Sequence, residues 1–155
     1  MAARATETPE QRLAAFLEAY TPAIAKQARA ALAKLRKRMP GAVELVYDNY
    51  NALAIAFATT ERLADAVFSI TLYPRYVSLL FTHGRGLPDP RKLLRGSGAR
   101  IRHVVLDDAS TLDDPAVRAL IDAALARAAT PLDPKRKRKL VIQSVSAKQR
   151  PRRPP

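Results

Sequence analysis

The chain lacks several side chains on which common sites depend. Its 155 residues include no cysteine and only two histidines. Disulfides and thiolate metal sites are therefore excluded, and few imidazoles remain for acid–base chemistry. No apolar run reaches the roughly 18 to 20 residues that cross a bilayer, and residues 1–7 lack the apolar segment of a signal peptide. These absences predict a cytoplasmic protein without a membrane span.

Positive charge is abundant and unevenly placed. The net charge is +13, and residues 131–155 hold nine Lys or Arg side chains against one acid, Asp133. Such a field attracts nucleic acid, anionic lipid or acidic proteins without selecting one of them. The densest part is a run of five cations, which we expect to contact nucleic acid or an acidic partner: Lys135, Arg136, Lys137, Arg138 and Lys139.

Local signals predict three main helices and about five strands. Helices are expected where a capping residue precedes a proline, at Thr8-Pro9, Thr21-Pro22 and Asp114-Pro115. Between them, alternating or continuous apolar runs predict strands near 43–47, 52–58, 66–72, 76–81 and 101–106. Short connections favour an antiparallel arrangement. The fold class is therefore α+β, an antiparallel sheet of about five strands with helices packed on one face.

The composition changes near residue 130. Residues 1–130 read as a single domain, whereas residues 131–155 are basic and rich in proline, which favours a flexible tail. Leu140–Val145 is a short run suited to a strand, so an additional strand at the sheet edge stays open as the alternative.

The stretch from Phe81 to His103 is the most distinctive segment. It contains four glycines, two prolines and six cationic side chains between two apolar runs. Asp89 is suited to cap a short helix that begins at Pro90 and ends at Gly96. We expect a rigid, basic loop at the surface between two neighbouring strands.

Two groups of polar side chains are candidates for ligand binding. Four arginines of the loop, together with nearby backbone N–H groups, have the chemistry to hold a carboxylate or phosphate: Arg85, Arg95, Arg100 and Arg102. Tyr47 and Asn49 could line a pocket at the end of the sheet. The alternative is that the glycines serve turns and that the Asp–Asn pair caps its own backbone.

The residues offer no complete set for catalysis. Hydrolysis or group transfer needs a nucleophile, a base and an orienting group, and His83 and His103 are the only imidazoles. If the two histidines converged, Asp107 and Asp108 could complete a metal site, although no metal-ligand spacing such as HExxH occurs. We therefore expect a non-enzymatic binding domain without a cofactor, and a metal site as the alternative.

The loop resembles the signature of the YdhG-like family of small bacterial domains of unknown function. The similar positions in and around it are Phe81, Gly84, Leu87-Pro88-Asp89-Pro90, Leu93-Leu94, Gly96, Gly98 and Arg102. Residues 44–51 and 76–79 are also similar, and the resemblance extends from about Phe16 to Ala129. It implies a frataxin-like α+β fold, and some relatives are linked to intracellular iron handling as iron chaperones.

This sequence departs from the acidic ridge that a frataxin-type iron chaperone uses. Iron prefers carboxylate or imidazole ligands, whereas the second helix carries a cationic outer face: Lys26, Arg29, Lys34, Arg36, Lys37 and Arg38. The sequence therefore predicts a binding module for a small anion or a protein partner. Iron chaperoning and nucleic-acid binding through the basic tail are the alternatives.

Overall fold

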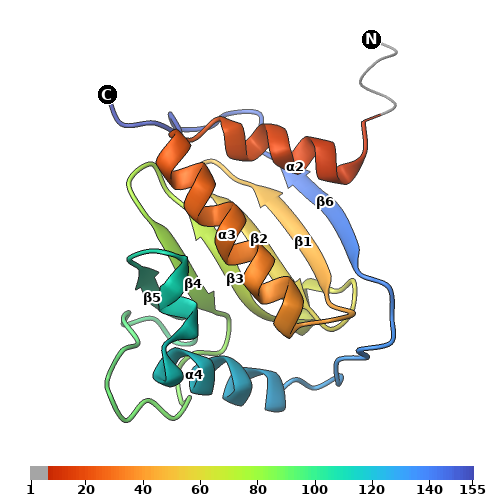
Figure 1. The fold of residues 1–155 in the computed structure, drawn as a ribbon, viewed down its shortest axis with the longest axis vertical. Helices are drawn as coiled ribbons and strands as arrows, with labels where there is room; N and C mark the ends of the chain where they lie inside the picture. The colour runs from red at the N-terminus through yellow and green to blue at the C-terminus, as the bar shows by residue number, and fades with distance from the viewer. Residues whose placement is uncertain (1–6) are drawn as a thin grey trace.

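The computed structural model describes residues 7–155 as an α+β fold with one six-stranded sheet (Figure 1). The helices are α2 (Pro9–Glu18), α3 (Pro22–Arg38) and α4 (Pro115–Ala126), with short 3-10 helices η1 (Leu63–Asp65) and η2 (Ala109–Asp113). The strands are β1 (Val43–Asp48), β2 (Leu53–Ala58), β3 (Ala66–Leu72), β4 (Val77–Phe81), β5 (Arg102–Leu106) and β6 (Lys139–Val145). Among residues 7–155, no helix is long and apolar enough to cross a membrane.

The three helix starts follow from local capping, as the sequence predicts. Thr8 and Gln11 form a reciprocal capping box at α2, and the Thr21 hydroxyl accepts a hydrogen bond from the Ile24 N–H at α3. The Asp114 carboxylate accepts from the Ala116 N–H at α4. Each cap satisfies a backbone donor that the first helical turn leaves unpaired.

The sheet has the order β5-β4-β3-β2-β1-β6. Strands β1 to β5 pair antiparallel, and β6 pairs parallel with β1. The registers define two ends. The β1–β2 and β3–β4 turns and the end of β6 lie at one, which we name the turn end. The loop between β4 and β5 and the start of β6 lie at the other, the loop end.

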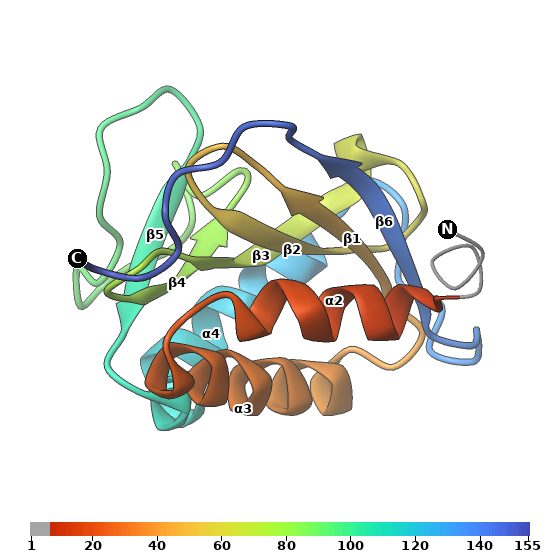
Figure 2. The same ribbon diagram turned by 90° about the horizontal axis from the view of Figure 1, so that it is seen from above.

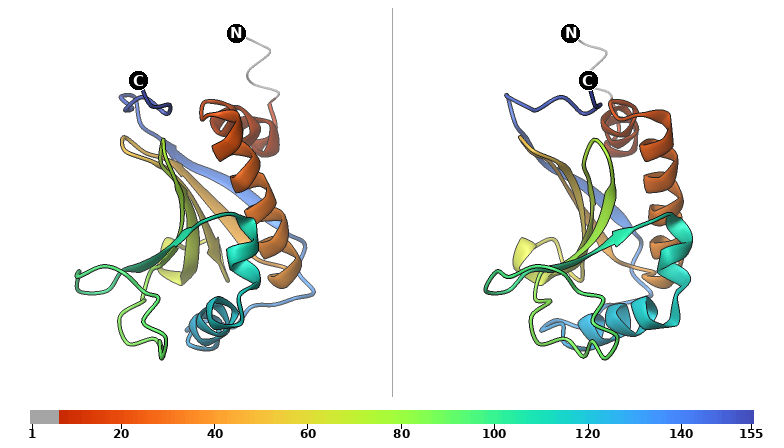
Figure 3. Two further views of the ribbon diagram at one scale, coloured as in Figure 1. Left: turned by 60° about the vertical axis from the view of Figure 1, so that its left-hand side comes forward. Right: turned by 90° about the vertical axis from the view of Figure 1, so that its left-hand side faces the viewer.

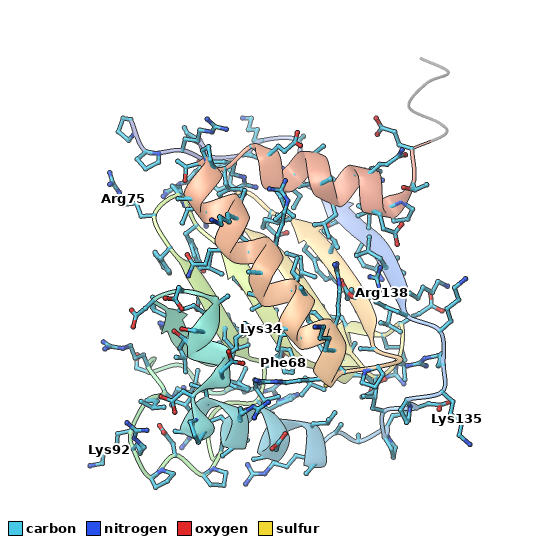
Figure 4. All side chains as sticks on the ribbon, viewed as in Figure 1. Lys34, Phe68, Arg75, Lys92, Lys135 and Arg138 are labelled. Atoms are coloured by element: carbon cyan, nitrogen blue, oxygen red, sulfur yellow. The ribbon has the colours of Figure 1, made fainter. Side chains whose placement is uncertain are left out.

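The helices lie on one face of the sheet, as Figure 2 shows from above. The main core fills the space between them and contains four buried aromatic rings, Tyr20, Phe57, Phe68 and Phe81. Phe68 is labelled behind α3 in Figure 4. The opposite face carries smaller side chains, including Ala56, Ala58 and Ser69. The expected α+β class with helices on one face is confirmed, but the sheet has six strands and is mixed.

The segment expected to be a flexible tail is instead part of the sheet. Leu140 is buried and Ile142 packs against the main core, while β6 supplies hydrogen-bond partners to the outer side of β1. Before β6, the Arg136 guanidinium donates to the Gly41 and Thr59 carbonyls. The folded unit therefore continues beyond residue 130, because apolar burial and backbone pairing outweigh the polar composition of the segment.

The loop between β4 and β5 is folded without the predicted helix. The Asp89 carboxylate accepts hydrogen bonds from the Leu93 and Leu94 N–H groups, both at 2.9 Å. It therefore caps a turn, and Lys92 interrupts any helix because its φ is +54°. The strands before and after the loop are neighbours, as predicted.

Candidate functional site

The predicted ligand-binding residues do not form one site, because they lie at opposite ends of the sheet. Asp48, beside Tyr47 and Asn49, pairs with Leu53 at the turn end. Arg85, Arg95 and Arg100 lie in the loop between β4 and β5, and Arg102 is the first residue of β5, also at the loop end. The sheet thus separates the two groups by the length of its strands.

The four loop arginines are held by backbone contacts in one folded segment. The Arg85 N–H donates to the Arg100 carbonyl at 2.9 Å, and Arg95 exchanges two backbone hydrogen bonds with His103. The Arg102 guanidinium donates to the Gly98 and Ile101 carbonyls at 2.7 Å. Arg102 therefore stabilises the loop itself, while Arg85, Arg95 and Arg100 are exposed.

The two histidines lie on opposite faces of the sheet. His103 is opposite Leu80 in the β4–β5 register, and Leu80 lines a hollow on the face without the main helices. His83 lines a hollow with Phe81 and Leu87 on the helix side. Directly opposite residues share a face, so the two imidazoles cannot bind the same metal ion.

The acidic residues proposed for the metal site serve other contacts. The Asp108 carboxylate accepts hydrogen bonds from the N–H and hydroxyl of Ser110, and these bonds lower its pKa. Asp107 is exposed, and its N–H donates to Thr111. Within residues 7–155, no group of three His, Cys, Asp or Glu side chains is placed to hold a metal ion.

A hollow of about 150 Å³ lies at the base of the loop. Its walls come from five segments: η1, the start of β3, the end of β4, the loop, and the end of α4 with the residues after it. The lining is largely apolar and includes Val67, Phe81, Leu87 and Ala124. We name it the loop-side pocket.

Three polar side chains border the loop-side pocket: Asp65, His83 and Arg127. Asp65 accepts a hydrogen bond from the Thr60 hydroxyl at 2.6 Å. Arg127 Nη1 donates to the Gly86 carbonyl at 2.8 Å, which fixes the guanidinium beside the pocket. A guanidinium has about five N–H donors, so most of the Arg127 donors are left for a ligand.

Tyr47 and Asn49 border a shallow hollow of about 230 Å³ on the face without the main helices. Ala54, Ala56 and Leu80 supply its apolar floor. Burial raises the pKa of the Tyr47 hydroxyl, which therefore stays protonated at neutral pH. Both residues, which the sequence predicts to line a pocket, border this hollow; ligand binding there stays a prediction.

The cationic run from residue 135 to 139 is largely engaged within the molecule. Arg136 binds two backbone carbonyls, as described above, and Arg138 Nη1 donates to Glu44 at 2.9 Å. The Lys139 ammonium lies 2.8 Å from the Glu61 carboxylate. All of these residues except Arg136 are nevertheless exposed, so the run faces solvent although three of its side chains have partners in the molecule (Lys135 and Arg138 in Figure 4).

Two buried carboxylates, Glu44 and Asp48, are paired with arginines. Glu44 is fully buried on the helix side of β1 and accepts hydrogen bonds from Arg36 as well as Arg138. Asp48 pairs at 2.8 Å with Arg152, and both side chains are buried. A buried carboxylate requires such partners. Sequence inspection missed both clusters; their only local signal is an acid inside an apolar strand.

Comparison of the chain with protein-family models, with curated proteins and with solved structures gives no significant match. The coarse α+β arrangement therefore rests on the structure itself. The YdhG-like resemblance and the frataxin-like fold stay predictions.

Proposed function

We propose that the protein is a non-catalytic binding domain that takes a small organic anion in the loop-side pocket. The supporting observation is the position of the Arg127 guanidinium, fixed by Gly86 at the rim of an apolar hollow. Concave apolar sites with a few convergent polar groups are the usual form of small-molecule sites. The anionic group would contact Arg127 and His83, and the apolar part would contact Phe81 and Leu87.

The size of the pocket limits the ligand. Its volume of about 150 Å³ is below the roughly 300–1,000 Å³ of sites for drug-sized molecules. A short-chain or single-ring carboxylic acid fits this description better than a nucleotide. Cations of the neighbouring loop, such as Arg85 and Arg100, would raise the local concentration of anions.

The iron-chaperone alternative gains no support from the geometry, because His83 and His103 lie on opposite faces. The alternative of nucleic-acid binding through residues 135–139 has less support, because Arg136, Arg138 and Lys139 already bind groups of the same molecule. The proposal for the loop-side pocket depends on neither.

The test is a thermal-shift screen of short-chain and aromatic carboxylates against the full chain and Arg127→Gln. A ligand at about 100 times its Kd stabilises the fold by about 2.7 kcal/mol, which corresponds to roughly 5–10 °C for a domain of this size. We expect Arg127→Gln to abolish the shift. Arg118→Gln, which removes an exposed cation from α4, the helix that Arg127 follows directly, is the control and should keep the thermal shift. If no acid stabilises the wild-type protein, the pocket is not an anion site.

A further inference from the structure

All five tyrosines of the chain lie at the turn end or beside it. They come from the α2–α3 junction, from β1, and from the β1–β2 and β3–β4 turns: Tyr20, Tyr47, Tyr50, Tyr73 and Tyr76. The left and right views of Figure 3 show the C-terminal segment at this same end. Aromatic and C-terminal cationic side chains are therefore gathered at the end opposite the loop-side pocket.

Two of these rings are available to solvent. Tyr50 is 49% exposed and Tyr76 is 40% exposed. Tyr76 stacks on Tyr73 with ring centroids 4.6 Å apart and an interplanar angle of 19°. The Arg150 guanidinium lies over the Tyr50 ring, 5.6 Å from its centroid. Each exposed ring is thus held in place by a second planar group.

An open hollow of about 550 Å³ separates the β3–β4 turn from the C-terminal segment. Its lining contains Arg75, Arg150 and Arg153, together with Asn51, Tyr73 and four prolines, and includes no Asp or Glu side chain. Arg75 projects outward from the turn in Figure 4. Arg153 is partly engaged, because its guanidinium donates to the Glu18 and Ala19 carbonyls at the end of α2.

The nearest buried acid does not cancel this positive charge. Asp48 is neutralised by Arg152, which also lies over the Tyr20 ring at 5.7 Å. Glu18 is exposed, and the Arg153 guanidinium is occupied by the Glu18 backbone carbonyl, so Arg75 and Arg150 are the better candidates for binding an external anion.

We propose that the turn end binds single-stranded nucleic acid, with Tyr50 and Tyr76 stacking on bases and Arg75 and Arg150 contacting phosphates. Single-strand sites combine a cationic groove with exposed aromatic rings, because unpaired bases offer their flat faces for stacking. A duplex keeps these faces inside its own stack. An acidic peptide would use the arginines but has no bases for the two rings.

Binding is measured by fluorescence anisotropy with the full chain and a labelled oligodeoxythymidylate of about a dozen nucleotides, the length of a typical single-strand site. An abasic oligonucleotide of equal length and polyglutamate provide the same charge without bases. Tyr50→Leu/Tyr76→Leu removes the rings but keeps apolar side chains. Arg75→Gln/Arg150→Gln removes two cations, and Lys135→Gln/Lys137→Gln removes two exposed cations at the loop end as the control.

We expect the tyrosine double variant to bind oligodeoxythymidylate at least roughly thirtyfold more weakly, because each of the two lost stacking contacts alone accounts for at least about fivefold. It should bind the abasic strand as the wild type does. The arginine double variant should reduce the slope of log affinity against log salt by about 1.4, since each phosphate contact contributes about 0.7 on a single strand. The lysine control should retain the wild-type affinity and slope.

A second measurement needs no variant. The chain contains no tryptophan, so its intrinsic fluorescence comes from tyrosine, and stacking on bases should quench it with oligodeoxythymidylate and not with the abasic strand. Equal binding of the abasic strand or of polyglutamate would overturn the proposal. The proposal would also be overturned if the lysine control lost as much affinity for oligodeoxythymidylate as the arginine double variant. The same holds if the wild-type protein does not bind the oligonucleotide at about 50 mM salt, where phosphate contacts are strong.

Discussion

Tyr20 is the residue that joins the helices to the turn end. Its hydroxyl donates to the Leu72 carbonyl and accepts from the Leu53 N–H, each at 3.1 Å, and its side chain is 1% exposed. Burial raises the pKa of this hydroxyl to about 12, and the nearby Arg152 partly opposes the rise. One phenol therefore ties together two strands and the α2–α3 junction.

Tyr20→Phe should lower the free energy of unfolding by about 1–3 kcal/mol near pH 7, because the Leu53 N–H and Leu72 carbonyl lose a buried partner. The raised pKa favours the neutral phenol in the folded state. The stability that this preference contributes is fully present below pH 10.0, the pKa of the tyrosine in the unfolded state, and is lost as the pH rises through about 12, the pKa in the folded state. Urea unfolding should therefore show the difference between variant and wild type narrowing above about pH 10. A constant difference across that range would contradict this account.

The buried carboxylates show which features could not be predicted from the sequence. Alternation in Val43–Tyr47 predicts a strand, but it does not tell which face the helices cover. Glu44 turns out to lie on the helix side, where it is fully buried. Its partner Arg138 is 94 residues away in the chain, and Arg152 is 104 residues from Asp48. No local pattern records such a pairing.

At the scale of elements, those with local signals were predictable. The capping residues and prolines at the starts of α2, α3 and α4 contact residues within one helical turn, so a short stretch of sequence is enough to predict each helix start. The turn after Pro90 shows the limit of such signals. Asp89 does cap backbone N–H groups, yet Lys92 adopts a left-handed conformation that no helix accommodates.

The loop gives a matched pair of substitutions. A Cβ atom on Gly84 would lie 2.5 Å from the Arg102 Cβ, whereas one on Gly98 would meet no atom within 4 Å. We expect Gly84→Ala to reduce the free energy of unfolding by about 1–3 kcal/mol, the usual cost of overpacking. Gly98→Ala should leave it nearly unchanged. Equilibrium unfolding in urea measures both, and equal effects would show that the base of the loop is not closely packed.

For the whole molecule, the least predictable feature is that residues 131–155 complete the fold. Polar composition favours a flexible tail, but composition does not reveal that the outer side of β1 needs a partner. A chain ending at Thr130 would lose β6 together with Arg138 and Arg152, which pair with Glu44 and Asp48. It would also expose the edge of β1, and exposed edges promote association.

We expect the chain ending at Thr130 to be less stable than the full chain by at least about 3–5 kcal/mol, since Asp48 becomes an unpaired buried charge. It should also elute as larger species in size-exclusion chromatography. A chain ending at Ala147 keeps β6 but loses Arg152, so it should be destabilised and stay free of this association. Unfolding and elution profiles equal to those of the full chain would show that β6 contributes little.

The pairing of β6 with β1 joins two strands that the ribosome makes at very different times. Glu44 leaves the ribosome long before Arg138, which follows 94 residues later. At about 5–20 residues per second, the β1 edge waits for several seconds without its neighbour. During translation, the nascent chain therefore presents an unfinished sheet to chaperones and to other nascent chains until Lys139–Val145 is made and pairs with β1.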